Sequence, residues 1–565
     1  MTANTHQYCN TAELLKSMAE LYGNRDAILA PFGLTHNGRS RFRKLTFSEL
    51  DSLANSYAGL FCVSGLTKGM KVLMMMHPGL EFTAAVFAVF RTGAIPVLID
   101  PGMGRQNFLG CVAQTAPDAM ISIPVVHWLR PLFRQHFSSV KLAFSCGIGS
   151  PPWVIGMERA ATPMSIKKRG KVAFSPVAVS VDDPAAILFT TGSTGAPKGV
   201  LYSHRTFLSQ VDIIRQVYGA GPEHVDMSAF PLFALFAVAL GMKTIVPHMD
   251  FTRPAKVDPR VVISIVRSQR VTFSFGSPAL WRTVGKYCRK HGETLPTLKL
   301  VLMAGAPVGA ELHELVGSII AADGATRVPY GATEALPITD FCGAEVLRDT
   351  AARTAMGEGH CVGTVNDGIT IRIIAATDAA IPHWDESLAL PSGEKGEIVV
   401  KGDVVTTMYY NRADATRLSK IADSDGQVWH RMGDMGYFDE QNRLWFCGRK
   451  NHRVITAERI YYSVCTEAVF NNHPDVFRSA LVGVVRGGVT VPVLWVEPRR
   501  GKMPHGDGAI RRFIHGLREK AQGVDICAGI DDFLFMKDFP VDIRHNAKIF
   551  REKLTVEAEK RLGCK

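Results

Sequence analysis

A loop rich in glycine and hydroxyl residues, with one lysine, follows directly on an apolar run that reads as a buried strand. Residues 187–200 are ILFTTGSTGAPKGV. Glycine lets backbone N–H groups approach phosphate oxygens closely, and Lys198 adds a positive charge. A Walker loop is excluded, because that motif requires G-x-x-x-x-G-K-S/T, whereas Pro197 precedes Lys198 and Gly199 follows it. We predict a phosphate-binding loop of another kind rather than a flexible linker, since linkers seldom follow a buried strand.

Three side chains further along the chain have the chemistry of a magnesium-nucleotide site. Glu334, in YGATE, offers a hard carboxylate oxygen, which suits Mg²⁺ held together with substrate phosphates. Asp434, in RMGD, could accept hydrogen bonds from two ribose hydroxyls. Arg449, in GRK, carries a planar fork of donors for the ribose or the α-phosphate. In isolation each also fits a plainer role, as a surface glutamate, a turn aspartate or a surface arginine.

Taken in order, these segments resemble the motifs of the acyl-adenylate-forming (AMP-dependent synthetase and ligase) superfamily, which holds acyl-CoA synthetases, beetle luciferases and peptide-synthetase adenylation domains. TTGSTGAPKG resembles its phosphate loop, AGAP its adenine-side strand end, YGATE its adenine and magnesium motif, RMGD its ribose motif and GRK the start of its hinge. The resemblance covers nearly the whole chain and implies that ATP and Mg²⁺ are the cofactors, with Glu334 as metal ligand and with Lys198 and Glu334 in catalysis. The nucleotide-binding residues that it implies are Thr190, Thr191, Gly192, Ser193, Thr194, Gly195, Lys198, Gly305, Ala306, Pro307, Tyr330, Gly331, Ala332, Thr333, Asp434 and Arg449.

A lysine near the end of the chain completes the resemblance. Lys548, in DIRHNAKIFREKL, aligns with the lysine that this family brings to the reacting carboxylate. The resemblance implies that it bridges carboxylate and α-phosphate oxygens and stabilises charge as the carboxylate attacks phosphorus. An ordinary lysine at a helix start is the alternative. The small domain of the family rotates about a hinge after Arg449, and Asn451 stands where Asp or Lys is usual, so the hinge residue stays open.

The region after the hinge departs from acyl-CoA ligases. Ala457 and Glu458 stand where a glycine is expected, and a carboxylate is a poor neighbour for anionic CoA. These residues, with the DIRHNAK ending, FPLFALFAVALG and HMDFTRP, resemble the β-lactone synthetases of bacterial long-chain olefin biosynthesis. Such enzymes adenylate a 2-alkyl-3-hydroxy fatty acid, whose own hydroxyl then displaces AMP to close a β-lactone. A long-chain fatty acyl-CoA ligase and a catalytically silent acyl-adenylate-binding protein are the alternatives.

The olefin-pathway resemblance also implies partners and an apolar pocket. The partners would be the thiolase-like condensing enzyme, the reductase and the β-lactone decarboxylase of that pathway. Residues 230–240, rich in Phe, Leu, Val and Ala, could line an alkyl channel or form a plain core element. His452 and His545 are candidates for the base of ring closure only because they flank two of the motifs.

In the first half of the chain, segments with helical periodicity alternate with short apolar runs typical of buried strands, and these elements must position the candidate residues. Residues 50–65 and 81–93 read as helices, and residues 72–77 and 94–100 as buried strands, with similar units at 261–277 and 297–309. This alternation predicts a large layered α/β domain over residues 1–447, of the adenylate-forming type. Strand-like runs at 481–485 and 491–497 and helices over 508–522 and at the C-terminus predict a small mobile α+β domain over 448–565.

Composition sets broad limits. The net charge of +12 suits anionic small molecules, a membrane surface or nucleic acid. The densest basic run, at residues 167–171, lacks interleaved aromatic residues and reads as a loop, so we expect no nucleic-acid partner. Scattered cysteines and the absence of a recognisable leader indicate a cytoplasmic protein with reduced thiols. The apolar stretch 229–242 is shorter than the ~20 residues of a spanning helix, so we expect no transmembrane segment.

Overall fold

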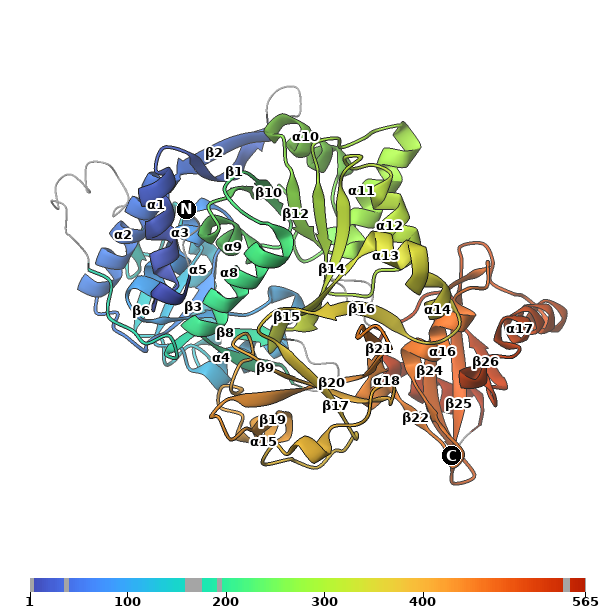
Figure 1. The fold of residues 1–565 in the computed structure, drawn as a ribbon. Helices are drawn as coiled ribbons and strands as arrows, with labels where there is room; N and C mark the ends of the chain where they lie inside the picture. The colour runs from blue at the N-terminus through green and yellow to red at the C-terminus, as the bar shows by residue number, and fades with distance from the viewer. Residues whose placement is uncertain (1–4, 35–39, 158–174, 191–195, 542–548, 564–565) are drawn as a thin grey trace.

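The computed structural model describes residues 5–34, 40–157, 175–190, 196–541 and 549–563 of the 565-residue chain. Five residues of the predicted phosphate loop (191–195), the basic run at 167–171, and His545 and Lys548 lie outside the described residues. The described chain forms two large sheets flanked by helices and a smaller C-terminal α+β region (Figure 1). The predicted α/β fold class is thereby confirmed.

A seven-stranded sheet contains the strand that leads into the predicted phosphate loop. Its strands are β3 (Lys71–Met75), β4 (Ile95–Leu98), β5 (Ala119–Ser122), β6 (Leu142–Ser145), β7 (Ile155–Gly156), β8 (Pro184–Thr190) and β9 (Lys198–Ser203). They run in the order β7-β6-β5-β3-β4-β8-β9, and all neighbours are parallel except the antiparallel pair β8 and β9. Thr190 lies opposite Lys198 in that pair, so the two ends of the loop are held together.

Helices cover this sheet because strands and helices alternate along the chain. They are α1 (Ala12–Tyr22), α2 (Phe47–Val63), α3 (Leu80–Arg91), α4 (Arg105–Thr115), α5 (Pro124–Leu129), which continues into the 3₁₀ turn η3 (Arg130–Phe133), and α8 (His204–Tyr218). The helices expected at 50–65 and 81–93 are α2 and α3. A capping box starts α2: the Thr46 hydroxyl accepts from Glu49 N, and the Glu49 carboxylate accepts from Thr46 N. The buried faces of α2 and α3 form one apolar core with the strands.

A second, 14-stranded mixed sheet contains the other predicted motifs. Its strands are β1 (Asp26–Leu34), β2 (Ser40–Thr46), β10 (Val225–Ser228), β11 (Lys243–Ile245), β12 (Phe273–Gly276), β13 (Leu300–Met303), β14 (Ala325–Ala332), β15 (Ala335–Cys342), β16 (His360–Val365), β17 (Thr370–Ile374), β18 (Gly396–Lys401), β19 (Lys420–Ala422), β20 (Val428–Phe438) and β21 (Leu444–Arg449). The order is β17-β18-β20-β21-β16-β15-β14-β13-β12-β10-β11-β1-β2, with β19 beside β20. In this order the strands between β14 and β1 are parallel. The strands from β14 to β17 pair antiparallel, as do β1 and β2 at the other edge.

The parallel part is built from strand and helix units with clear start signals. Its helices are α9 (Phe233–Ala239), α10 (Pro259–Gln269), α11 (Pro278–His291) and α12 (Ala310–Gly317). Asp258 and Ser277 cap α10 and α11, each directly before a proline in the first turn. In the described part of the chain no helix combines the length and apolarity needed to cross a bilayer.

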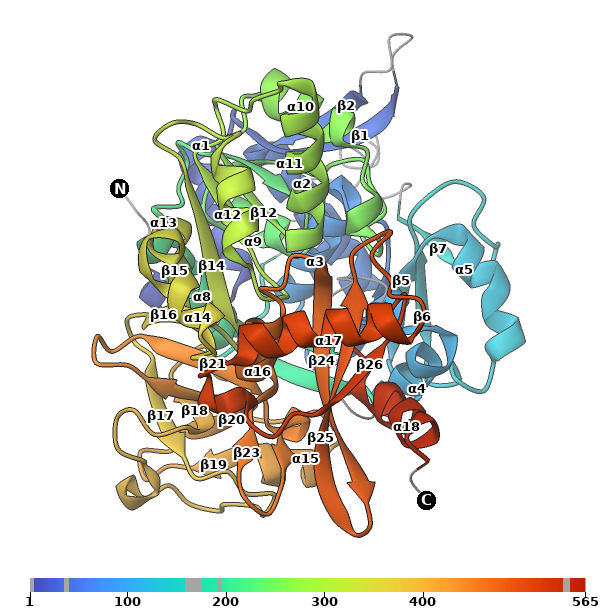
Figure 2. The same cartoon turned by 90° about the vertical axis from the view of Figure 1, so that its right-hand side faces the viewer.

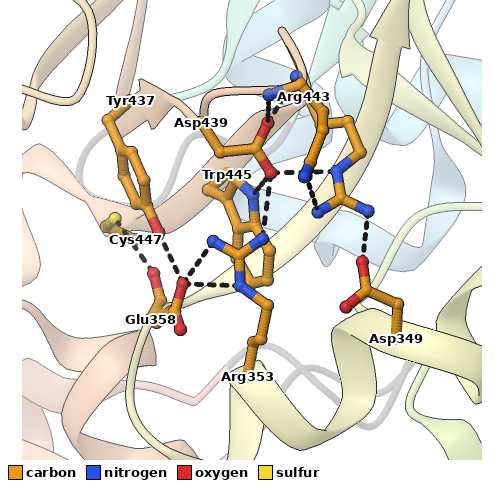
Figure 3. Close-up of polar contacts among 9 residues, drawn as sticks. Asp349, Arg353, Glu358, Tyr437, Asp439, Arg443, Trp445 and Cys447 are labelled. Atoms are coloured by element: carbon orange, nitrogen blue, oxygen red, sulfur yellow. Dashed lines mark hydrogen bonds and ion pairs between the residues drawn. The ribbon is translucent and has the colours of Figure 1, made fainter.

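A polar network fixes the antiparallel part against the π-helical turn η5 (Val346–Thr350) and helix α14 (Ala351–Ala355) (Figure 3). The carboxylate of Asp439 accepts from Arg443 Nε at 2.9 Å, Arg353 Nη1 at 3.2 Å and Trp445 Nε1 at 2.8 Å. Arg353 also pairs with Glu358 at 2.5 Å and stacks over the Trp445 ring. The network joins β20 and β21, the strands that bear Asp434 and Arg449.

After β21 the chain leaves the 14-stranded sheet and forms a region with its own sheet and core (Figure 2). Its elements are η7 (Lys450–His452), β22 (Val454–Ile455), β23 (Ile460–Tyr461), α16 (Ser463–Phe470), β24 (Val476–Arg486), β25 (Val489–Pro498), α17 (Asp507–Ala521), β26 (Asp532–Phe535) and α18 (Arg551–Arg561). Strands β24 and β25 form a long hairpin, and β26 pairs in parallel with β25. The strands and helices expected in this part of the chain are all present.

Candidate active site

Tyr330, Asp434 and Arg449 meet, although they come from three different strands. Asp434 on β20 pairs in register with Arg449 at the end of β21. The Tyr330 hydroxyl, on β14, donates to Asp434 Oδ2 at 2.6 Å, and Arg449 Nη1 lies 2.9 Å from Asp434 Oδ1. Gly448, next to Arg449, lets β21 pack closely against the start of α16, because a Cβ there would lie 2.5 Å from Ser463 Oγ. The structure therefore brings three separately predicted motifs, YGATE, RMGD and GRK, into one polar group.

The Asp434 carboxylate is buried yet retains an acceptor. Burial raises the pKa of Asp434, and the ion pair with Arg449 opposes that shift. Its Oδ1 atom accepts no hydrogen bond with proper geometry from any described residue, although Arg449 lies within ion-pair distance. A buried acceptor of this kind costs free energy unless a partner satisfies it. A ribose hydroxyl would be a suitable partner, and this observation fits the residues to a nucleotide.

Glu334 and Lys198 approach each other through Tyr409. Glu334 lies in the turn between β14 and β15, and its Oε1 accepts the Tyr409 hydroxyl at 2.7 Å. Lys198 Nζ, at the start of β9, lies 4.9 Å from the centre of the Tyr409 ring. The segment that carries Tyr409 is tied to β9, because Tyr410 N donates to Gly199 O at 2.7 Å. Tyr409 is thus a site residue that the sequence did not reveal.

Lys420 is a second residue that the motifs did not indicate. It is buried on β19, and its ammonium donates to the carbonyl oxygen and the hydroxyl of Thr406. Thr406 in turn donates its backbone N–H to Glu334 O at 2.9 Å. Burial lowers the pKa of Lys420 to about 7, and Glu334 opposes that shift. In sequence Lys420 is simply a lysine before an apolar pair, and no local pattern distinguishes it.

Three cations of the site act on one buried histidine. His430 lies opposite Lys420 across β19 and β20, and its Nδ1 lies 3.2 Å from Ser419 O. Burial lowers the pKa of His430 well below its ordinary value, and the charges of Lys420, Lys198 and Arg449 lower it further. All three side chains thus lie near enough to His430 for their charges to act on it. A positive region of this kind suits the phosphates of a nucleotide.

The remaining nucleotide-binding candidates lie at strand ends. Gly305, Ala306 and Pro307 follow β13 at its carboxyl end, where ligands commonly bind in open α/β sheets. Gly305 has a φ of +94°, a conformation that favours glycine. Gly331 and Ala332 end β14, and Thr333 accepts the Tyr202 hydroxyl at its carbonyl oxygen at 2.5 Å. The placement of Thr190 at the end of β8 is described for its backbone alone.

The described residues contain no cluster of three or more His, Cys, Asp or Glu side chains that could hold a metal. Glu334 supplies a carboxylate beside Tyr409, whose hydroxyl its Oε1 already accepts. Mg²⁺ in nucleotide enzymes is typically held by one or two carboxylates together with substrate phosphates. One carboxylate beside a phosphate-binding region therefore fits a magnesium ion that arrives with ATP.

The segment proposed to line an alkyl channel and the candidate base His452 show no feature of a binding site in the part of the chain that the structure describes. The segment 230–240 contains α9, whose Phe233 ring stacks on Phe275 with centroids 4.7 Å apart. An apolar cavity lined in part by Leu235, Phe236 and Ala239 measures about 20 Å³, which is too small for an alkyl chain. The core alternative therefore describes α9 in this structure. His452, on η7, lies 3.4 Å from Arg551 of α18, within the C-terminal region.

Comparison with known proteins places the chain in a family. The model of the AMP-binding enzyme family matches residues 16–410. The chain is 41% identical over 556 residues to the olefin beta-lactone synthetase of Xanthomonas campestris pv. campestris, and this alignment covers 97% of each chain. It is also 41% identical to the olefin beta-lactone synthetase of Stenotrophomonas maltophilia, over 98% of this chain and 99% of the other.

More distant matches share the fold. 4-Coumarate–CoA ligase 5 of Oryza sativa subsp. japonica is 25% identical over 81% of this chain and 80% of its own. The solved structure of the amide bond synthetase McbA from Marinactinospora thermotolerans superposes with a TM-score of 0.77 at 20% identity, over 97% of this chain and 99% of the other. The motifs, their assembly into one site and these matches show that the chain belongs to the family of AMP-binding enzymes.

Proposed function

We propose that this protein is an ATP-dependent β-lactone synthetase, which adenylates a 2-alkyl-3-hydroxy long-chain fatty acid and closes it to a β-lactone in long-chain olefin biosynthesis. One observation carries the proposal: identity to two olefin beta-lactone synthetases is 41% over nearly the full chain, against 25% over 81% of the chain for a CoA ligase. On the basis of the same sequence similarity, we propose that the enzyme is cytoplasmic and that its partners are the condensing enzyme, reductase and lactone decarboxylase of that pathway.

The geometry supports the adenylation half-reaction. Asp434 would accept the ribose hydroxyls while Tyr330 and Arg449 hold its carboxylate in place. Lys198 would bind the phosphates together with the loop at residues 190–195, and Gly305 to Pro307 would border the adenine. Glu334 would hold Mg²⁺, whose charge neutralises the phosphates when it is bound. We assign the bridging of carboxylate and α-phosphate to Lys548, which lies outside the described residues.

Both half-reactions balance without a third substrate. A carboxylate oxygen of the acid attacks the α-phosphorus of ATP, the new P–O bond forms, and pyrophosphate leaves. The 3-hydroxyl oxygen then attacks the acyl carbon, the hydroxyl loses its proton, and AMP leaves with the bonding electrons of the broken C–O bond. A hydroxyl held beside its own activated carbonyl has a high effective concentration, so positioning and the exclusion of water are what the protein must supply. His452 and His545 stay the candidate bases.

The C-terminal region would control the second half-reaction. We propose that residues 448–565 form a mobile domain that moves about the chain after Arg449, the last residue of β21. Ala457 and Glu458 lie exposed in the turn between β22 and β23. An exposed carboxylate there would repel CoA if this turn borders its path, which favours the lactone over the thioester.

Product analysis tests the proposal directly. The enzyme is incubated with ATP, Mg²⁺ and a 2-alkyl-3-hydroxy fatty acid, with and without CoA, and the products are identified by mass spectrometry. AMP, pyrophosphate and a β-lactone are expected under both conditions. The matched 3-deoxy acid should still release pyrophosphate, but its adenylate has no internal nucleophile and should accumulate or hydrolyse slowly. An acyl-CoA thioester with CoA, and no lactone without it, would establish the acyl-CoA ligase instead. Failure to release pyrophosphate with any fatty acid would indicate the silent binding protein.

A further inference from the structure

Helix α5 and the turn η3 present an apolar face to solvent instead of to the core. Val125, Trp128, Leu129 and Leu132 follow the spacing i, i+3, i+4, i+7 of one helical face, yet each exposes 49–75% of its surface. Such a stripe normally packs inward. Figure 2 shows α5 and β7 in a lobe that stands out from the body of the molecule.

The orientation of this helix is fixed by polar contacts on its other side. His127 is fully buried, and its Nε2 lies 2.9 Å from Phe144 O on β6. Trp128 Nε1 donates to Gly149 O at 2.9 Å, so the polar atom of the indole is satisfied while its ring stays exposed. The outward direction of the stripe is therefore part of the packing of the lobe and not a loose attachment.

A neighbouring loop extends the apolar surface. The ring of Trp153 meets that of Trp128 edge to face, with centroids 5.4 Å apart, and Trp153 is 56% exposed. Ile148, next to Gly149, is 93% exposed. We call Val125, Trp128, Leu129, Leu132, Ile148 and Trp153 the tryptophan face. A contiguous exposed apolar patch with aromatic residues marks an interaction surface rather than ordinary surface composition.

The segment that bears the tryptophan face contains basic but no acidic residues. Between Asp118 and Glu158 the sequence contains no acidic residue, whereas Arg130, Arg134 and Lys141 lie in that interval. Arg134 and Lys141 are exposed, and none of the three forms an ion pair with another described residue. Asp118 lies beside Lys141, whose backbone N–H donates to Asp118 O at 2.9 Å, but the Asp118 carboxylate pairs with Lys71. A complementary surface would therefore combine an apolar area with anionic groups near Arg134 and Lys141.

We propose that the tryptophan face docks the enzyme on the surface of an anionic lipid bilayer. Indole rings with a satisfied N–H and Leu and Ile side chains enter the region between headgroups and acyl chains, while neighbouring Arg and Lys side chains pair with lipid phosphates. The lack of acidic residues in this segment favours a lipid surface over a protein partner, whose interface would ordinarily meet charges of both signs. The value of such docking rests on the proposed function, because a long-chain 2-alkyl-3-hydroxy acid partitions into membranes.

Vesicle co-sedimentation of the full chain without substrate tests this proposal separately from lactone formation. Wild type should bind vesicles of phosphatidylcholine and phosphatidylglycerol, bind pure phosphatidylcholine more weakly, and lose affinity for the anionic vesicles at high salt. Leu132→Glu, at an exposed position with no structural contact to lose, should weaken binding by ~10-fold or more. Trp128→Ala with Trp153→Ala should do the same. The matched control is Phe477→Ala, which removes a half-exposed aromatic ring on β24.

The same variants test whether folding is intact and whether a second copy or another protein covers the tryptophan face instead. Thermal melting and pyrophosphate release with detergent-dispersed acid should be unchanged in Leu132→Glu. The proposal is overturned if wild type does not bind anionic vesicles, or if Leu132→Glu binds as well as wild type or Phe477→Ala. It is also overturned if light scattering shows a dimer that Leu132→Glu dissociates, because the face would then be covered by a second copy. Capture of a purified pathway enzyme by this face, without vesicle binding, would assign it to a protein partner.

Discussion

Replacing Asp434 with asparagine should remove recognition of the ATP ribose while leaving the fold largely intact. The buried carboxylate accepts the Tyr330 hydroxyl at 2.6 Å on one oxygen, and the other oxygen lies 2.9 Å from Arg449 Nη1. Asparagine keeps the shape and one acceptor, but it loses the negative charge and presents an N–H₂ group to either Tyr330 or the ribose. The variant should therefore weaken ATP binding rather than the chemistry of a bound acid.

The size of the effect follows from the type of bond. A hydrogen bond to a charged acceptor contributes about 1.5–3 kcal/mol, and each 1.4 kcal/mol corresponds to about tenfold in an equilibrium constant. Loss of one charge-assisted bond to a ribose hydroxyl should thus lower kcat/KM for ATP by ~10- to 150-fold. Most of this should appear in KM, since the bond is made in both the ground state and the transition state.

Pyrophosphate release with ATP, 2′-deoxy-ATP and 3′-deoxy-ATP measures the interaction itself. Wild type should discriminate against at least one deoxy analogue by a factor similar to the loss in Asp434→Asn, and the variant should discriminate little. The matched control is Asp340→Asn: Asp340 is also buried, accepts the Tyr218 hydroxyl at 2.8 Å and pairs with Arg327, but no nucleotide role is predicted for it. That control should keep full discrimination.

The reasoning is refuted if Asp434→Asn distinguishes ATP from both deoxy analogues as strongly as wild type does. A general loss of activity with unchanged discrimination would show that Asp434 supports the fold and does not contact the ribose. If Asp340→Asn loses discrimination to the same degree, the effect belongs to the packing of the sheet and not to the proposed site.

Three further outcomes are expected. Lys548→Ala should lower the rate of adenylate formation by ~10²–10³ while ATP binding measured by calorimetry survives, and near-normal pyrophosphate release would remove Lys548 from the site. Glu334→Gln should raise the Mg²⁺ concentration needed for half-maximal activity, and excess Mg²⁺ should partly rescue it. Tyr409→Phe should show the same change more weakly. If Glu334→Gln keeps full activity at limiting Mg²⁺, Glu334 is not the metal ligand. Burial lowers the pKa of Lys420 to about 7. Above that pH the unfolded chain therefore binds a proton that the folded enzyme lacks. The free energy of unfolding should then rise by up to ~1.4 kcal/mol per pH unit from pH 7 towards 10. Lys420→Met should lose this gain in urea unfolding, and an equal pH dependence in both proteins would argue against a neutral Lys420.

Much of the fold was predictable because its signals are local. Helix α2 combines apolar periodicity with a capping box that lies within four residues, and β3 is a short run of apolar residues that follows Lys71. The glycine-rich loop, YGATE, RMGD and GRK are likewise continuous segments. Their function followed from a resemblance in order and type, and the structure then showed that Tyr330, Asp434 and Arg449 meet.

The missed residues depend on contacts between distant segments. Tyr409 and Thr406 bind Glu334 from more than 70 positions away, and neither belongs to a segment with a recognisable chemical pattern. Lys420 is significant only because β19 pairs with β20 and becomes buried. Burial of a lysine cannot be inferred from its neighbours in sequence, since lysine is ordinarily exposed.

The distribution of charge in the site has a physical logic that the motifs alone do not express. Lys420 and His430 face each other on paired strands, and burial lowers the pKa of both, which favours their neutral forms. Arg449 behaves in the opposite way, because the charge of Asp434 raises its pKa. The fold therefore keeps positive charge on Arg449, beside the aspartate of the RMGD motif, and leaves Lys198 half-buried at the start of β9. Lys420, whose pKa burial lowers to about 7, lies deeper and supports the turn at Glu334 indirectly, through its hydrogen bonds to Thr406.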